Sequence, residues 1–236
     1  MLVIAEKHVS ATIIICLIAF IMMFVGGTKF RYFAVIGGAA AAAIGALVLF
    51  SSKFAYAMDR VHGWLDPFNP PEGVDTWQTV QSLYAIGSGQ LLGVGIGQSR
   101  QKYLYIPEPQ NDFVLSVVCE ELGFIGCTAI IVLLLVYLLR VLYIASKARD
   151  DLGRCMCFGF FGLIALQSVS NIGMCLALLP VMGVTLPFFS AGGSSAVCLY
   201  LGFGLIQSVY MHRPDANVPH LRSTRTLKMN FRKLNA

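Results

Sequence analysis

The stretch that decides the fold is Phe113–Leu139, "FVLSVVCEELGFIGCTAIIVLLLVYLL". A helix needs about 20 mostly apolar residues to cross a bilayer, and this stretch is longer than that. Its only charges are Glu120 and Glu121, and the run Leu122–Leu139 that follows carries none. Carboxylates at such a depth are costly unless they face protein, water or a cation. The stretch therefore predicts a membrane-spanning helix whose early part places two carboxylates against protein, water or a cation.

Composition also indicates a membrane protein. Of the 236 residues, 57% are hydrophobic and 12% are charged, whereas soluble domains carry about 25% charged residues. The seven cysteines lie mostly in apolar runs, and they show neither a disulfide framework nor the spacing of a zinc site. We therefore predict no metal-binding motif.

Four further apolar segments accompany 113–139, so we predict an all-α integral membrane domain over residues 1–212 with about five transmembrane helices. Between the second and third spans lies a large loop, residues 51–112, which we expect to contain short helices. In it, "TVQSLYAIGSGQLLG" (79–93) predicts an amphipathic or re-entrant helix. The other spans are expected at residues 11–27, 33–50, 155–179 and 196–211.

The distribution of the 17 lysines and arginines predicts the orientation. Most of them gather between spans one and two, between spans three and four, and in the tail 213–236. The positive-inside rule assigns these regions, including the C-terminus, to the cytoplasm. The loop 51–112 and the turn Leu179–Ser195 are then extracellular, and the loop is not basic, so we expect no nucleic-acid partner. An odd number of spans would put Met1 outside, which suggests the later part of a larger protein.

Asp112 stands at the expected start of the third span. There it can cap the helix, as can Asn111, because a carboxylate accepts the free N–H groups and suits the positive helix end. It can also act as a general base, since a carboxylate at a partly dry surface can take a proton from an attacking hydroxyl. Glu108, Arg100 and Lys102 lie close by in the chain. The two roles are compatible.

Polar groups inside the spans leave alternatives open. Glu120 and Glu121 either form a buried hydrogen-bond network or contact a substrate or ion. The polar patch around Asn171 in the fourth span either joins helices through hydrogen bonds or lines a path for a polar headgroup.

Two glycine-rich stretches add further candidates. Residues 87–97 precede Ser99–Lys102 and form either a tight extracellular loop or a backbone cradle for phosphate, although no known nucleotide fingerprint is present. The turn Leu179–Ser195 is rich in proline and glycine, which favours a re-entrant turn facing a cavity. Its serines have no suitably placed His and Asp partners, which argues against a serine hydrolase.

These motifs resemble the two signature regions of the SEDS family, whose members FtsW, RodA and SpoVE act in bacterial cell division, cell shape and sporulation. The resemblance covers the chain except its basic tail, and it is to the C-terminal part of such proteins. The matching residues are Gln81-Ser82, the glycines of 87–97, Gln101-Lys102, Pro107-Glu108, Asp112-Phe113, Glu120–Gly123, Pro180, Gly183, Pro187 and Gly192–Ser195.

The resemblance implies a peptidoglycan glycosyltransferase of the bacterial cell membrane. Such a protein polymerises lipid II at the outer membrane face, beside a class B penicillin-binding protein and other divisome or elongation proteins. By motif, Asp112 corresponds to the family's essential aspartate, the proposed catalytic base, and Glu108 to another important acidic position. Further candidates for substrate binding are Gln81, Ser82, Arg100, Gln101, Lys102, Glu120, Glu121, Asn171, Ser194 and Ser195. Arg100, Lys102 or a divalent cation (Mg or Mn, ligands unassigned) would support departure of the prenyl diphosphate.

The sequence also departs from the family pattern. Family members have about ten spans, and the common Ala-His-Thr-Asp and Ser-Tyr-Gly-Gly read Pro-Gln-Asn-Asp at 109–112 and Ser-Ala-Gly-Gly at 190–193. The first five spans would form one wall of the substrate cavity, so a chain without them is expected to be inactive alone. Two alternatives to glycosyl transfer remain open. One is a flippase that transports lipid II, and the other is a non-catalytic scaffold for a class B penicillin-binding protein.

Overall fold

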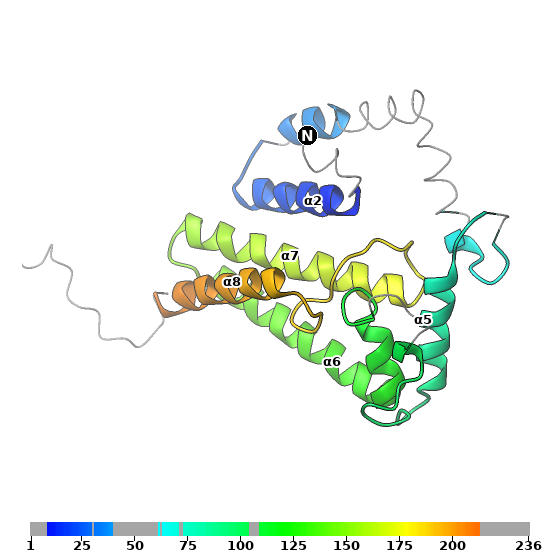
Figure 1. Ribbon diagram of the computed structural model, residues 1–236. Helices are drawn as coiled ribbons and strands as arrows, with labels where there is room; N and C mark the ends of the chain where they lie inside the picture. The colour runs from blue at the N-terminus through cyan, green and yellow to red at the C-terminus, as the bar shows by residue number, and fades with distance from the viewer. Residues whose placement is uncertain are drawn as a thin grey trace, which may run out of the picture.

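The structure is a computed structural model that describes residues 9–29, 31–39, 61, 63–70, 73–103 and 109–212. Helices, turns and loops make up these residues without a strand among them, which confirms the predicted all-α class. Three of their helices are long and apolar enough to cross a membrane (Figure 1). They are α6 (Val114–Ser146), α7 (Asp151–Cys175) and α8 (Gly193–Met211).

The other helices lie in the predicted first spans and in the loop. Helix α2 (Val9–Val25) occupies the first predicted span and is short, with 17 residues. Residues 31–39, at the start of the second predicted span, are helical, and residues 40–50 lie outside the described part. In the loop, α5 (Trp77–Ser88) forms where a short helix was expected, and η1 (Gln101–Tyr103) is a 3₁₀ turn. The predicted tail 213–236 and the site candidate Glu108 also fall outside the described residues.

Helix α6 continues to Ser146, beyond its predicted end at residue 139, although Arg140 interrupts the apolar run. The reason lies in the neighbours of that arginine. Its guanidinium lies over the rings of Tyr143 and Tyr210, 5.2 and 5.3 Å from their centroids. A long side chain that places its charge at the end of a span in this way does not terminate the helix.

Helix α7 is shifted toward the N-terminus relative to the predicted 155–179. It starts early because Asp150 caps it, its carboxylate accepting the N–H of Gly153 at 3.1 Å. It ends at Cys175 because the chain then curls back. The Gly173 carbonyl accepts the N–H groups of both Leu178 and Leu179.

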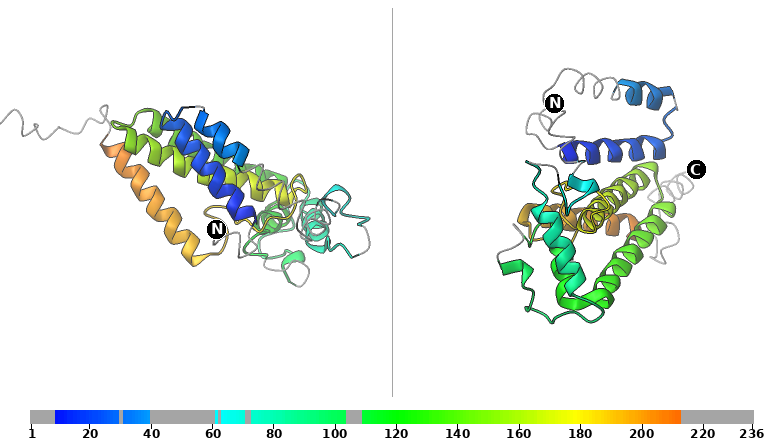
Figure 2. Two further views of the ribbon diagram at one scale, coloured as in Figure 1. Left: turned by 90° about the horizontal axis from the view of Figure 1, so that it is seen from above. Right: turned by 90° about the vertical axis from the view of Figure 1, so that its right-hand side faces the viewer.

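Helix α7 is the centre of the bundle. Helix α2 packs on one side of it and α6 on the other, and α8 contacts both α6 and α7 (Figures 1 and 2). Glycines make these contacts close, because Gly159 and Gly162 of α7 face Met22 and Ile21 of α2. Small residues at helix interfaces let backbones approach where lipid offers no hydrophobic drive between helices.

The predicted continuous span 113–139 is in fact broken at Gly123, which has φ 68° and ψ −171°. The break leaves backbone groups without their helical partners, and the loop after α5 supplies new ones. The carbonyls of Glu120 and Glu121 accept the N–H groups of residues 94 and 95 at 2.9 and 3.0 Å. In return, the N–H groups of Phe124 and Ile125 donate to the carbonyls of residues 90 and 91 at 2.8 and 3.2 Å.

Two glycines of the segment 87–97, Gly89 and Gly93, serve this docking, because a side chain on either would collide with the backbone of α6. Gly93 has φ +80°, and a Cβ on it would collide with the Glu121 carbonyl and the Gly123 nitrogen. The N–H groups of Gly93, Val94 and Gly95 all donate to carbonyls within the chain. A phosphate therefore finds none of these three donors available, which excludes the cradle hypothesis for this part of the loop.

Gly93→Ala should destabilise the protein more than Gly97→Ala. Both glycines have a positive φ, which costs alanine about 1–2 kcal/mol, but a Cβ at Gly97 meets open space. The additional collision at Gly93 must displace the loop from the broken helix. Thermal unfolding of the two variants in detergent measures the difference, and equal losses would show that the docking contributes nothing.

Candidate functional site

Three consecutive backbone carbonyls, those of residues 110–112, hold the segment that carries the predicted base. In chain order, they accept hydrogen bonds from the Ala191 N–H at 2.9 Å, the Ser190 hydroxyl at 2.6 Å and the Asn171 amide at 2.6 Å. These donors come from α7 and from the turn before α8. The two regions that resemble family signatures are thus joined at one point of the structure.

Asn171 is the central residue of this junction. Its side chain is completely buried, and its Nδ2 group donates both to the Asp112 carbonyl and to the Val184 carbonyl, each at 2.6 Å. Its amide oxygen accepts the Cys175 thiol at 3.8 Å. Of the two hypotheses for this polar patch, the structure shows structural hydrogen bonding at Asn171. The residue holds the aspartate segment and leaves no open path for a headgroup at this position.

The Asp112 carboxylate faces the turn 176–190. The residue is half-buried, and a Cβ built on Gly183 would lie 3.5 Å from its Oδ2 atom. Gly183 has φ +61°, so glycine is suited to this position by its conformation, whereas a Cβ there would only make an ordinary van der Waals contact with Asp112. Phe113 occupies the cap position of α6, which places Asp112 one residue further from the helix than a cap would be.

Glu120 forms the buried network that the sequence left open. Its side chain is only 2% exposed. It accepts the Ser99 hydroxyl at 2.5 Å, the Arg100 N–H at 3.0 Å and the Gln101 N–H at 3.4 Å. These bonds satisfy the charge inside the protein, so the candidate substrate contact of Glu120 is replaced by a role in holding residues 99–101.

Glu121 holds the same segment through an ion pair. Its carboxylate lies 2.8 Å from the Lys102 ammonium and also accepts the N–H groups of Gly97 and Ser99. The hydrogen bond to Glu121 raises the pKa of Lys102 above its ordinary value of 10.5. Glu120 and Glu121 therefore bind the segment that follows the glycine-rich loop, at a point about 12 Å further along the helix from Asp112.

The remaining candidates are divided between buried and exposed positions. Ser82 is fully buried, 2.6 Å from the Ser116 hydroxyl and donating to the Cys175 carbonyl at 2.8 Å, so it joins α5, α6 and α7. Gln81, beside it on α5, is also buried. This junction, with Ser116 and Cys175, was not recognised from the sequence, because nothing local indicates that three helices meet there.

The exposed candidates are Arg100 and Ser194, whose contact with a substrate stays a prediction. The Ser195 hydroxyl donates to the Gly192 carbonyl at 3.0 Å, at the start of α8. The Gln101 amide oxygen is buried and finds no hydrogen-bond partner among the described residues. Among the described candidates, Gln101 is therefore the one whose side-chain oxygen could still accept a hydrogen bond.

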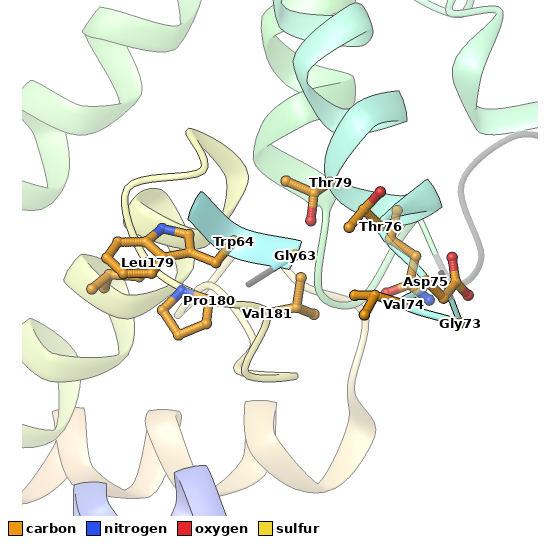
Figure 3. A pocket seen from close by; sticks show the side chains of 11 residues that line it. Gly63, Trp64, Gly73, Val74, Asp75, Thr76, Thr79, Leu179, Pro180 and Val181 are labelled. Atoms are coloured by element: carbon orange, nitrogen blue, oxygen red, sulfur yellow. The ribbon is translucent and has the colours of Figure 1, made fainter. Parts of the chain in front are cut away.

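A pocket of about 360 Å³ lies away from all these candidates, between the segment around Trp64, the start of α5 and the turn after α7 (Figure 3). Trp64, Leu179 and Pro180 line one side, and Thr76 and Thr79 line the other. The Trp64 indole is fixed by its N–H, which donates to the Ala177 carbonyl at 2.8 Å. Sequence reasoning assigned no role to this pocket, whose walls come from distant parts of the chain.

The expected divalent cation has no ligand set in the described part of the chain. Nowhere in those residues do three His, Cys, Asp or Glu side chains come together in a way that could hold a metal ion. The divalent cation therefore stays a prediction, and the proposed chemistry does not depend on it.

Comparison with known proteins gives a consistent match. The profile of the FtsW/RodA/SpoVE family, described as "Cell cycle protein", matches residues 1–215. The chain is 42% identical over 189 residues to stage V sporulation protein E of Bacillus subtilis (strain 168), covering 80% of this chain and 50% of that protein. It is 35% identical over 208 residues to a probable peptidoglycan glycosyltransferase FtsW of Trichlorobacter lovleyi, covering 88% of this chain and 54% of that protein.

A solved structure is similar as well. Its description is "Structural coordination of polymerization and crosslinking by a peptidoglycan synthase complex". The similarity has a TM-score of 0.67 at 28% sequence identity, and covers 91% of this chain and 59% of that chain. This chain spans about half the length of the curated relatives it matches.

Asn171→Ala should loosen the aspartate segment, whereas Ser168→Ala on the same helix should not. The first change removes the amide donor from two carbonyls, at about 1–3 kcal/mol each, and leaves the Asp112 carbonyl with the weak Cys175 thiol contact at 3.8 Å. The Ser168 hydroxyl is buried without a partner in the described part of the chain, so its removal should be neutral. Hydrogen exchange of peptides covering 109–113 and 183–187 checks this, and unchanged exchange in Asn171→Ala would contradict the assigned role.

Lys102→Gln should lower the melting temperature at neutral pH, and the difference from wild type should close only above pH 10.5. A raised folded-state pKa means that the ion pair stabilises the protein fully below 10.5 and is lost as pH rises through the raised value. The exposed Lys29→Gln serves as the control. If the Lys102 difference were already absent at pH 9, the ion pair with Glu121 would not be stabilising.

Proposed function

The chain belongs to the FtsW/RodA/SpoVE family of cell cycle proteins, and on that premise we propose that it carries the base of a peptidoglycan glycosyltransferase. The proposal extends to this chain the activity named for its FtsW relatives. The substrate class is a lipid-linked disaccharide, of which lipid II is the example, used at the outer face of the bacterial membrane.

The observation that carries the proposal is the way Asp112 is held. Three carbonyls fix its backbone on two separate elements, while its half-buried carboxylate faces the turn at Gly183. A base that must meet a hydroxyl in one orientation benefits from such positioning before substrate arrives. The Glu120 carboxylate accepts hydrogen bonds from residues 99–101, which supports a structural role for it.

The proposed reaction is a displacement at the anomeric carbon. The Asp112 carboxylate takes the proton of the acceptor sugar hydroxyl. At the same time, the oxygen of that hydroxyl forms a bond to the anomeric carbon of the donor. The bond from that carbon to the phosphate oxygen breaks, and the prenyl diphosphate leaves with the electron pair. The exposed Arg100, which follows the glycine-rich loop, is the candidate that would attract the departing diphosphate. Lys102 would assist it, although its charge is already paired with Glu121.

A crosslinking enzyme is the proposed partner. The similar solved structure is described as a complex that coordinates polymerization and crosslinking, and a class B penicillin-binding protein supplies the second activity. The relative named for sporulation and the FtsW relatives support a role of the proposed complex in sporulation or cell division. The lipid II transport alternative loses support at Glu120 and Asn171, because both side chains are satisfied by protein.

The test uses a chimera in which this chain replaces the segment it matches in the Bacillus subtilis protein, with the crosslinking partner co-purified. Asp112→Asn should lower glycan polymerisation from fluorescent lipid II by at least about 100-fold. The matched control is Asp151→Asn, an exposed aspartate at the other end of α7 whose contact is a surface ion pair with Arg154. That variant should polymerise at the wild-type rate.

Three outcomes of this experiment are distinguishable. Full polymerisation by Asp112→Asn would refute the assigned base. Movement of labelled lipid II across vesicles by a chimera that forms no glycan would favour transport. Co-purification with the partner, without glycan from any variant, would favour the scaffold.

A further inference from the structure

The loop between α5 and η1 exposes large aliphatic side chains. Leu92 and Ile96 are 80% and 81% exposed, and Leu91 is exposed as well. The first residues after the break in α6, Phe124 and Ile125, are also exposed apolar side chains. We call these five residues the apolar patch. Such a group on one surface is unusual for a water-facing loop and marks a partner or a membrane.

Five backbone groups in and beside this loop form hydrogen bonds. Its carbonyls at residues 90 and 91 and its N–H groups at 93, 94 and 95 are all paired, mostly with the broken part of α6. Irregular backbone cannot lie against hydrocarbon unless its polar groups find partners within the protein. The loop meets part of that condition, because the carbonyls of residues 90 and 91 and the N–H groups of residues 94 and 95 pair with α6 groups that its break has freed.

The patch is also continuous with the surface of a membrane-spanning helix. Phe124 and Ile125 begin the uncharged run of α6, whose residues Leu133 and Val136 expose their side chains further along. The N–H groups of Phe124 and Ile125 donate directly to the loop carbonyls. In Figure 1 the loop lies at the foot of α5, beside the early part of α6. Val136 lies eleven residues after Ile125 and therefore about 20° from it around the helix, so this face of α6 leads from the patch into the apolar run.

Charged groups begin where the patch ends. The exposed Arg100 and the pair of Lys102 with Glu121 follow the loop within a few residues. An apolar tip followed by basic residues is the pattern of a segment that lies at a membrane boundary, with aliphatic groups in the acyl region and cations among the phosphates.

We propose that residues 91–96 insert into the acyl region of the leaflet at this end of the bundle and form a membrane anchor. Lipid acyl chains are the partner of Leu91, Leu92 and Ile96. The anchor is joined to α6 by the four hydrogen bonds around Gly123. The depth of insertion consequently sets the height above the bilayer of the first segment of α6, which begins beside Asp112. This inference does not depend on the proposed reaction.

Photo-crosslinking tests the anchor on the full chain in vesicles of phosphatidylcholine and phosphatidylglycerol. A benzophenone amino acid replaces Leu92 or Ile96, whose exposure lets the larger side chain fit. Leu133, exposed in the uncharged run of α6, is the lipid-facing control, and the exposed polar Asn69 is the water-facing control. After irradiation, mass spectrometry counts the peptides that carry a phospholipid.

Lipid adducts at Leu92 and Ile96 should equal those at Leu133 and exceed those at Asn69 about tenfold, as expected for side chains in the acyl region. Adduct yields at both positions as low as at Asn69 would overturn the proposal. So would crosslinks to a second copy of the chain in place of lipid, since the patch would then be a docking surface for a protein. The photo-crosslinking experiment does not require the chain to be active, so its outcome is independent of the test of Asp112.

Discussion

The structure depends on one constraint, that the backbone groups freed where α6 breaks must be paired inside the protein. Gly123 leaves the helical conformation, and four hydrogen bonds to residues 90–95 replace those that the helix loses. In a membrane, unpaired backbone groups would cost several kcal/mol each. The exchange fixes the loop after α5 on α6, and it thereby brings residues 99–102 onto Glu120 and Glu121.

The three acidic residues of this region, Asp112, Glu120 and Glu121, are held by different kinds of contact. Glu120 is buried and accepts three hydrogen bonds from residues 99–101, which makes it a structural acceptor. Glu121 is paired with Lys102. Asp112 is held through its backbone carbonyl, which accepts a hydrogen bond from the Asn171 amide. Positioning through the main chain is a way to orient a base before its substrate arrives.

The two proposals meet at the first segment of α6. One end of this segment carries Asp112, and the other end meets the apolar patch at the break. An anchor in the lipid and a base in the site are then joined by about three turns of helix. For a substrate with a membrane-bound tail, the distance from the bilayer to the reacting sugar is set by the substrate itself. A catalyst of this kind gains from fixing the same distance in its own structure.

Hydrophobic runs, charge and motifs in the sequence were sufficient to predict the all-α membrane class, the family and the short helix in the loop. They do so because length, apolarity and local turn chemistry are properties of neighbouring residues. The break at Gly123, the role of the glycines at 93 and 123, and the pairing of Asn171 with Asp112 could not be predicted in this way. Each depends on which distant backbone groups come within hydrogen-bond distance, as residues 94 and 120 do, and only the packed chain decides that. The sequence determined which segments are long and apolar enough to cross a membrane. The tertiary structure decided which carboxylates accept buried hydrogen bonds and which backbone groups pair, because these contacts join residues far apart in the chain.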